Sequence, residues 1–156
     1  MTSIAQELLR GAIDTHIHAA PDVLPRLLDD HELARVATEA GMAAIVLKSH
    51  HMLTADRAHL AQKLFPEVKV LGGLALNRPT CGGLNPDAVR VALRLGARII
   101  WLPTLSSHNH VERIKIRTTG YLGKMSAGFT PASVPVLDEN GEVVPELREI
   151  LAMIAE

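Results

Sequence analysis

Residues 42–51 read Met42-Ala43-Ala44-Ile45-Val46-Leu47-Lys48-Ser49-His50-His51. The first six form a short, continuous apolar run, which is typical of a β-strand buried on both faces of a parallel sheet. The next four are polar, and two of them are histidines. Because parallel α/β proteins build their sites at the carboxyl ends of their strands, this segment indicates both a fold class and the place of a site.

The order of strand and helix recurs along the chain. Strands are expected at 11–18, 42–47, 68–76 and 97–102, and helices at 3–10, from Asp29 or Asp30 to 40, from a cap at Thr54 to 65, at 86–95 and from Pro145 onward. A long polar connection is expected over 105–130, and a small hairpin over 134–144. Strand then helix, four times, predicts a single parallel α/β domain over residues 1–156.

The composition limits the function classes. The chain has 156 residues, the size of one ordinary domain, and 47% of them are apolar. Its 16 basic and 17 acidic residues leave a formal net charge of -1, which gives no reason to expect nucleic acid or an anionic membrane as partner. The single cysteine, Cys81, fits a reducing compartment, and no apolar run approaches the roughly 18 residues of a membrane span. We therefore expect a cytoplasmic protein.

A second polar segment, Asp14-Thr15-His16-Ile17-His18, ends the first expected strand. Side chains alternate along a strand, so Asp14, His16 and His18 are expected on one face, with Asp14 placed to orient an imidazole. Two imidazoles two residues apart can bind one transition metal or a close metal pair. For this motif alone, two polar histidines that bind no ligand remain the alternative.

Six of the eight histidines follow expected strands. They are His16 and His18, His50 and His51, and His108 and His110, whereas His31 and His59 fall on expected helices. Because the carboxyl ends of parallel strands meet at one edge, this clustering predicts a metal or proton-transfer site there.

Four segments carry a family resemblance. They are Asp14-Thr15-His16-Ile17-His18-Ala19-Ala20-Pro21-Asp22-Val23, Val46-Leu47-Lys48-Ser49-His50-His51, Gly82-Gly83-Leu84-Asn85-Pro86 and Ile100-Trp101-Leu102-Pro103-Thr104. Together they resemble the amidohydrolase superfamily of metal-dependent hydrolases, and within it an uncharacterised amidohydrolase-like subgroup. The resemblance implies a (β/α)8 TIM-type barrel, of which this chain supplies the first four units as a half barrel. An open, flavodoxin-like parallel sheet is the alternative fold.

The resemblance also implies a divalent metal, with zinc expected before manganese or iron, held by His16, His18 and His50. Water activated by the metal would attack an amide, ester or lactone bond of a small molecule. His50 is alternatively a proton shuttle. Lys48 is expected either to take part in catalysis or to bind an anionic group of the substrate, since the carboxylated lysine of some members usually comes from the fourth strand. Further substrate contacts are expected from Asn77, Arg78, Thr104 and His108.

Two other functions remain as alternatives. Phosphoesterases like those of the polymerase and histidinol phosphatase (PHP) family also open with a histidine pair, but here Lys48-Ser49-His50 stands where an acidic residue is expected before the histidine. A non-catalytic metal-binding fragment is the third reading, because the family's later histidines and its aspartate base lie in the second half of the barrel. Open sheet edges lead us to expect either a homo-oligomer or pairing with a missing C-terminal half.

Overall fold

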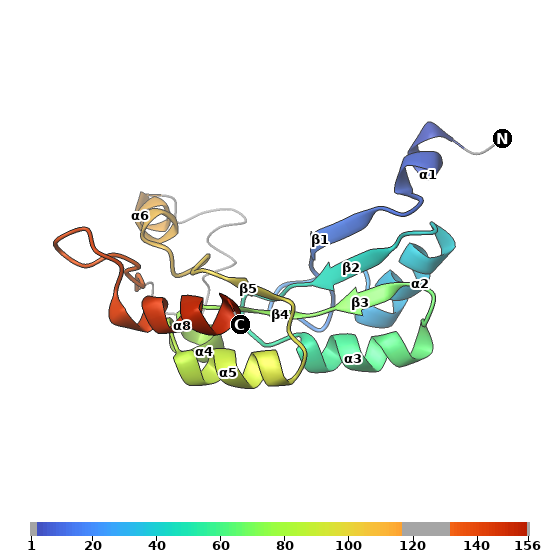
Figure 1. The fold of residues 1–156 in the computed structure, drawn as a ribbon. Helices are drawn as coiled ribbons and strands as arrows, with labels where there is room; N and C mark the ends of the chain where they lie inside the picture. Colours follow the sequence, from blue (N-terminus) through green and yellow to red (C-terminus); the bar gives the residue numbers. More distant parts are fainter. Residues whose placement is uncertain (1–2, 117–131, 156) are drawn as a thin grey trace.

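The computed structural model describes residues 3–116 and 132–155 of the chain. Their elements are, in order, α1 (Ile4–Leu9), β1 (Ile13–Ile17), α2 (Asp30–Glu39), β2 (Ala44–Leu47), α3 (Ala55–Leu64), β3 (Lys69–Leu71), β4 (Gly73–Ala75), α4 (Arg78–Cys81), α5 (Pro86–Arg94), β5 (Ile99–Trp101), α6 (His108–Ile116) and α8 (Pro145–Ala155) (Figure 1). The predicted α/β class is confirmed. Among these residues no helix is both long enough and apolar enough to cross a membrane.

The strands all pair in parallel. β1, β2 and β3 form one sheet in that order, and β4 pairs with β5 in a second. Only Gly72 separates β3 from β4, so the strand expected over 68–76 is a single path with a break, and the strands follow one another in sequence order. Both sheets are open and do not close into a barrel, and along the path that joins β3 to β4 the outermost strands of the described residues are β1 and β5.

Two adjacent glycines make this break possible. A side chain on Gly72 would overlap the backbone of Thr54 and Ala55, where α3 begins. A side chain on Gly73 would overlap the carbonyl oxygen of Ile99 and the ring of Trp101. Glycine is therefore required at both positions by the close approach of other parts of the chain.

Four of the helices, α2, α3, α5 and α8, cover one face of the strands. Figure 1 shows α2, α3 and α5 on the same side, and α8 packs beside α5. Two hydrophobic clusters lie on this side. In the first, Ile45, Leu47 and Val70 are buried against α2 and α3. In the second, Leu74 packs with residues of α5 and α8. Because side chains alternate along β2, the chain beyond Leu47 turns Lys48 toward the opposite face. The polar strand ends therefore meet away from the helices.

Thr54 ties two of these strand ends together. It precedes α3 as predicted, but its hydroxyl makes no capping hydrogen bond. It donates instead to the carbonyl oxygen of Leu47 at 2.7 Å and accepts from the N–H of Gly73 at 2.9 Å. The prediction of a side-chain cap is thus wrong, because the hydroxyl serves the strand break rather than the helix.

We expect Thr54→Val to lower the free energy of unfolding by about 1–3 kcal/mol, because it keeps the shape but leaves buried backbone groups of Leu47 and Gly73 without a partner. Thr54→Ser retains the hydroxyl and is the matched control. Denaturant unfolding measures both variants, and equal stabilities for the two would contradict the role of the hydroxyl.

Three local predictions need correction. The polar connection expected over 105–130 contains a helix, α6, whose Val111 is buried, and residues 117–130 of that connection lie outside the described residues. The four-residue helix α4 was not predicted. The hairpin expected over 134–144 is reduced to one antiparallel bridge between Leu137 and Val143.

Candidate functional site

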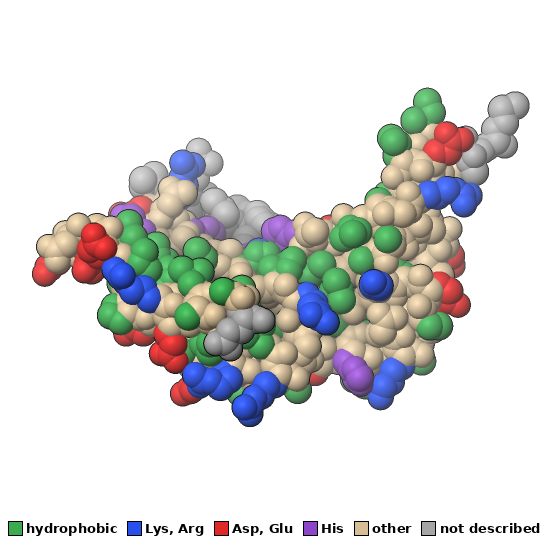
Figure 2. All heavy atoms as spheres, viewed as in Figure 1, with side chains coloured by type: hydrophobic (Ala, Val, Ile, Leu, Met, Phe, Trp, Pro, Cys, Tyr) green, Lys and Arg blue, Asp and Glu red, His purple; other side chains and the backbone are tan. Residues whose placement is uncertain are grey.

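His16 and His18 meet at the end of β1. Their Nε2 atoms lie 3.2 Å apart, and their ring centroids are 5.2 Å apart. Figure 2 shows histidine side chains at the surface in the hollow between the end that carries α1 and the end that carries α6. The predicted pairing of the two imidazoles is therefore present, and it faces an accessible part of the molecule.

A bulge in β1 changes the expected place of Asp14. Asp14 is paired with Ile45 and Ile17 with Leu47, so three steps along β1 match two along β2. The alternation that was to place Asp14 beside the two imidazoles is broken, and the carboxylate accepts a hydrogen bond from the backbone N–H of His16 at 2.9 Å. Asp14 thus holds the backbone of the motif, and the prediction that it shares the face of the two histidines is wrong.

Asp22 and Arg26 hold the other edge of the His18 ring. The Asp22 carboxylate is fully buried, and Arg26 binds it at 2.6 Å. The same guanidinium lies 3.3 Å from His18 Nδ1. A guanidinium can only donate, so Nδ1 accepts, and a neutral His18 carries its proton on Nε2, directed at His16. Asp22 Oδ2 lies 3.9 Å from the same Nδ1 and is the nearby acceptor for a proton placed there.

His50 lies beside this pair and is held by buried polar groups. Its ring centroid is 4.8 Å from that of His18, and its Nδ1 is hydrogen-bonded to Thr104 Oγ1 at 2.9 Å. Asn77, which is 0% exposed, donates from Nδ2 to the same Oγ1 and to the carbonyl oxygen of His50. Three strand ends are therefore linked around one imidazole.

Lys48 and Trp101 complete the group. Lys48 is only 4% exposed, and its Nζ lies 5.0 Å from the centroid of the Trp101 ring. The His16 ring lies 6.3 Å from the same tryptophan. The ammonium group of Lys48 and the ring of His16 therefore both lie near the Trp101 ring. For the rest of the article, the site cluster means His16, His18, Lys48, His50, Trp101 and Thr104.

The environment keeps these histidines neutral at neutral pH. Burial, followed by the charge of Arg26, lowers the pKa of His18 to about 4. Burial, followed by the charges of His18 and Lys48, lowers the pKa of His50 to about 3. Burial and then the charge of Lys48 also lower the pKa of His16. Neutral imidazole is the form that binds metals, because its free lone pair is the ligand.

These shifts predict a loss of stability in acid. The folded-state pKa values of about 4 for His18 and about 3 for His50 lie below the ordinary value of 6.5, so the unfolded chain binds more protons as the pH falls below 6.5. The contribution is complete above pH 6.5 and is lost as the pH falls toward 4. Between pH 7 and pH 5 we expect the free energy of unfolding of chelator-treated protein to fall by about 2–4 kcal/mol, with up to about 2 kcal/mol from each histidine.

Denaturant unfolding at the two pH values measures this loss. His18→Gln and His50→Gln each remove one of the titrating groups, so each should reduce the difference between the two pH values. An unchanged difference in both variants would show that other groups cause the acid sensitivity.

The residues fit a divalent metal in part. Two nitrogens that share a tetrahedral zinc ion lie about 3.3 Å apart, close to the 3.2 Å between the Nε2 atoms of His16 and His18. Across residues 3–116 and 132–155, however, no three His, Cys, Asp or Glu side chains are grouped so that they would hold a metal ion together. His50 is adjacent to the pair but stacks against His18 at an interplanar angle of 31°. The described residues thus supply two paired candidate ligands, His16 and His18, and the ring of His50 lies next to that of His18.

The remaining predicted residues lie in different places. Arg78 is exposed at the start of α4 and uses its backbone N–H to bind Ser106 Oγ at 2.9 Å. His51 turns away from His50, with its Nδ1 3.3 Å from Asp22 Oδ1. His110 lies on α6, where burial lowers its pKa. None of these three side chains belongs to the site cluster.

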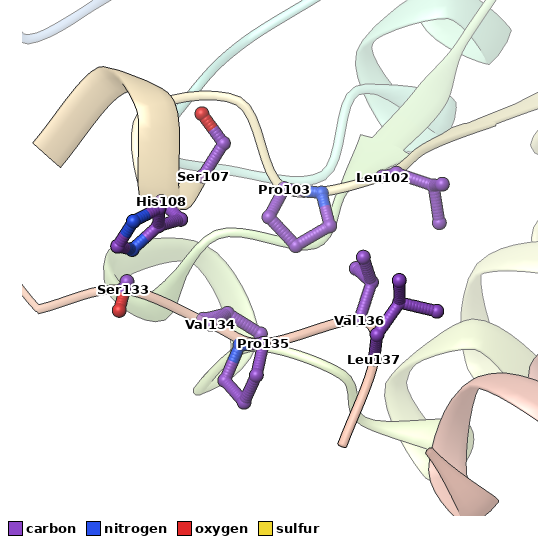
Figure 3. Close-up of a pocket in the computed structure, with 9 residues that line it drawn as sticks. All are labelled: Leu102, Pro103, Ser107, His108, Ser133, Val134, Pro135, Val136 and Leu137. Atoms are coloured by element: carbon purple, nitrogen blue, oxygen red, sulfur yellow. The ribbon is translucent and has the colours of Figure 1, made fainter. Parts of the chain in front are cut away.

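His108 lines a separate apolar cavity. This cavity of about 560 Å³ is drawn in Figure 3 and is bounded by Leu102, Pro103, Ser107, His108 and residues 133–137. Six of its nine lining residues are leucine, valine or proline, and none of the nine belongs to the site cluster. The structure therefore places the predicted substrate contact His108 apart from the histidines at the strand ends.

Asp22 and Arg26 were not predicted from the sequence as site residues. A signal was present in their spacing, because His18, Asp22 and Arg26 are each four residues apart. The spacing alone does not identify them, since the segment that carries them is not helical and only its folded path brings them to the His18 ring.

The fold and the site define a class, an open parallel α/β protein with a cluster of neutral histidines and a buried lysine at the carboxyl ends of its strands. The chain belongs to a family described as "Family of unknown function (DUF6282)", whose model matches residues 11–156. No curated protein and no solved structure matches the chain.

Proposed function

We propose that this chain is a metal-dependent hydrolase of the amidohydrolase type, acting on an amide, ester or lactone bond of a small molecule. The observation that carries the proposal is the 3.2 Å pairing of two Nε2 atoms at the end of a parallel strand. The low pKa values of His18 and His50 support it, because an imidazole that is neutral at neutral pH keeps a lone pair available for a metal.

The strand order supports the half-barrel fold that this proposal implies. Strands in sequence order with helices on one face are the arrangement of a (β/α)8 barrel. A flavodoxin-like sheet has the order 2-1-3-4-5 and helices on both faces. We therefore infer that the four strand units are the first half of a barrel, whose interior face carries the site cluster.

His16 and His18 would hold the metal, most suitably zinc, with manganese or iron as alternatives. When bound, the metal supplies an acidified water and polarises the carbonyl oxygen of the substrate. For both Nε2 atoms to act as ligands, His18 must carry its proton on Nδ1, where Asp22 Oδ2 lies 3.9 Å away. Asp22 would then be a positioning residue, because its carboxylate is the acceptor available to a proton on this nitrogen and also binds Arg26 at 2.6 Å.

His50 and Thr104 form a proton path in this proposal. His50 is joined to Thr104 Oγ1 at 2.9 Å and would take a proton from the attacking water and pass it to the leaving group. Its pKa of about 3 makes it a weak base and a strong acid, so the transfer to the leaving group is the easier of the two. Asn77 holds both residues in place, with its Oδ1 accepting from the N–H of Thr104 at 2.9 Å.

We expect Asp22→Asn to weaken zinc affinity about 10- to 100-fold, because the ring of His18 loses its anionic partner. Competition against a fluorescent zinc chelator measures the change. Asp87→Asn, which breaks an exposed ion pair with Arg90, is the matched control and should leave the affinity unchanged. Equal affinities for the two variants would remove Asp22 from the site.

A hydrolysis screen tests the function itself. Protein purified without chelator is offered small amides, esters, lactones and phosphomonoesters, then treated with chelator and reloaded with zinc or manganese. We expect hydrolysis of one of the carbonyl classes, loss on chelation and recovery on reloading. Activity confined to phosphomonoesters would favour a PHP-like phosphoesterase, and metal binding without any hydrolysis would favour a non-catalytic metal-binding protein.

A further inference from the structure

Lys48 is a buried cation without a counter-charge. It is 4% exposed, and among the residues that the structure describes no carboxylate forms an ion pair with it and no side chain accepts a hydrogen bond from it. Two acidic groups beside the histidines are engaged elsewhere, since Asp22 binds Arg26 and Asp14 accepts from the backbone N–H of His16. Burying an ammonium group without a paired anion is costly, so a residue of this kind in a structure calls for an anion.

Trp101 gives this cation a fixed place. The ammonium lies over the indole ring at 5.0 Å, and the ring itself is packed where Gly73 leaves room for it. A cation–π contact partly compensates the charge but leaves the hydrogens of the ammonium free to donate. The group is therefore oriented and still able to bind.

The side chains around Lys48 indicate what kind of ligand it would bind. The charge of Lys48 acts on all three histidines of the site cluster, which places it within electrostatic reach of each. The His16 ring and the ammonium share the Trp101 ring, at 6.3 Å and 5.0 Å. An oxyanion held by Lys48 would thus put the rest of a small molecule beside His16 and His18.

We propose that Lys48 and Trp101 form the binding site for an oxyanion of the substrate, so that the substrate class is small anionic molecules that carry a carboxylate or phosphate group. The naming of this anion as part of a substrate rests on the proposed hydrolase function. The binding itself does not, because it needs neither the metal nor any reaction.

The chain carries its own reporter for this binding. Trp101 is the only tryptophan, and it contacts the proposed site directly. In chelator-treated protein at constant ionic strength, we expect succinate to change the fluorescence of Trp101 saturably, whereas its neutral counterpart succinamide does not. Inorganic phosphate in place of succinate distinguishes the two sources of the oxyanion, since the tighter ligand identifies the group that the site prefers.

Two variants test whether Lys48 is the group that binds the anion. Lys48→Met should weaken succinate or phosphate binding by about tenfold or more, because it removes the ammonium charge that would hold the anion, and Lys48→Arg should retain binding. The comparison of succinate with succinamide on the wild-type protein needs no variant, so the test holds even if Lys48→Met fails to fold.

The proposal would be overturned by equal binding of the two ligands, by unchanged anion binding in a folded Lys48→Met protein, or by an intact mass showing Lys48 carboxylated, which would replace its positive charge. Metal content is measured separately. Loss of anion binding with an intact metal centre would reject this inference alone, and a missing metal centre with intact anion binding would reject the hydrolase proposal alone.

Discussion

Replacing Asn77 with alanine is expected to lower the free energy of unfolding by about 3–5 kcal/mol. The side chain is fully buried, its Nδ2 donates to the carbonyl oxygen of His50 and to Thr104 Oγ1, and its Oδ1 accepts from the N–H groups of Thr104 and Ser106. Alanine would leave the N–H groups of Thr104 and Ser106 without this acceptor, and would remove one of the two donors to the His50 carbonyl oxygen, which keeps its bond from Thr80 Oγ1. Each buried group left without a partner costs about 1–3 kcal/mol.

Denaturant unfolding of chelator-treated protein measures this loss. Asn140→Ala, at an exposed turn, is the matched control and should change stability by less than about 0.5 kcal/mol. A loss in Asn77→Ala that is no greater than in the control would contradict the network. Asn77 was predicted from the sequence as a substrate contact, but its place in the structure is that of a residue that positions His50 and Thr104.

The second large effect is expected on metal affinity. His16→Ala and His18→Ala should each weaken zinc binding by more than about 100-fold, because each removes one of the two nitrogens that lie 3.2 Å apart. Competition with a chelator of known affinity measures both. His51→Ala is a useful comparison, since His51 is adjacent in sequence to His50 but its Nδ1 faces Asp22. A smaller effect from His51→Ala than from either ligand variant is expected, and an equal effect would mean that the ligands are misassigned.

The fold class could be predicted because buried strands and helices show recognisable patterns of apolar residues in the sequence. The apolar run before Lys48 became β2, and the predicted cap residue Asp29 begins α2 with a capping box. The break at Gly72 could not be predicted, because it depends on the approach of Thr54, far away in sequence. The helix α6 was missed because its polar sequence follows a strand and does not show a clear apolar face.

The site could be predicted only where it lies on strand ends. Alternation along a rigid strand brought His16 and His18 together, and the parallel arrangement brought His50 and Thr104 beside them. Asp22 and Arg26 could not be predicted, because they lie on an irregular segment that folds back onto His18. Such a segment has no regular spacing of apolar and polar residues that would show which side chains meet. Asp14 was misplaced because a single bulge reverses the alternation.

Metal content per chain tests the central claim most directly, by elemental analysis of protein purified without chelator and then loaded with a slight excess of zinc. We expect about one zinc per wild-type chain, almost none in His16→Ala/His18→Ala, and wild-type content in His31→Ala/His59→Ala, whose histidines are exposed on α2 and α3. Zinc retained in the His16→Ala/His18→Ala protein, or a wild-type chain that takes up none, would contradict the account.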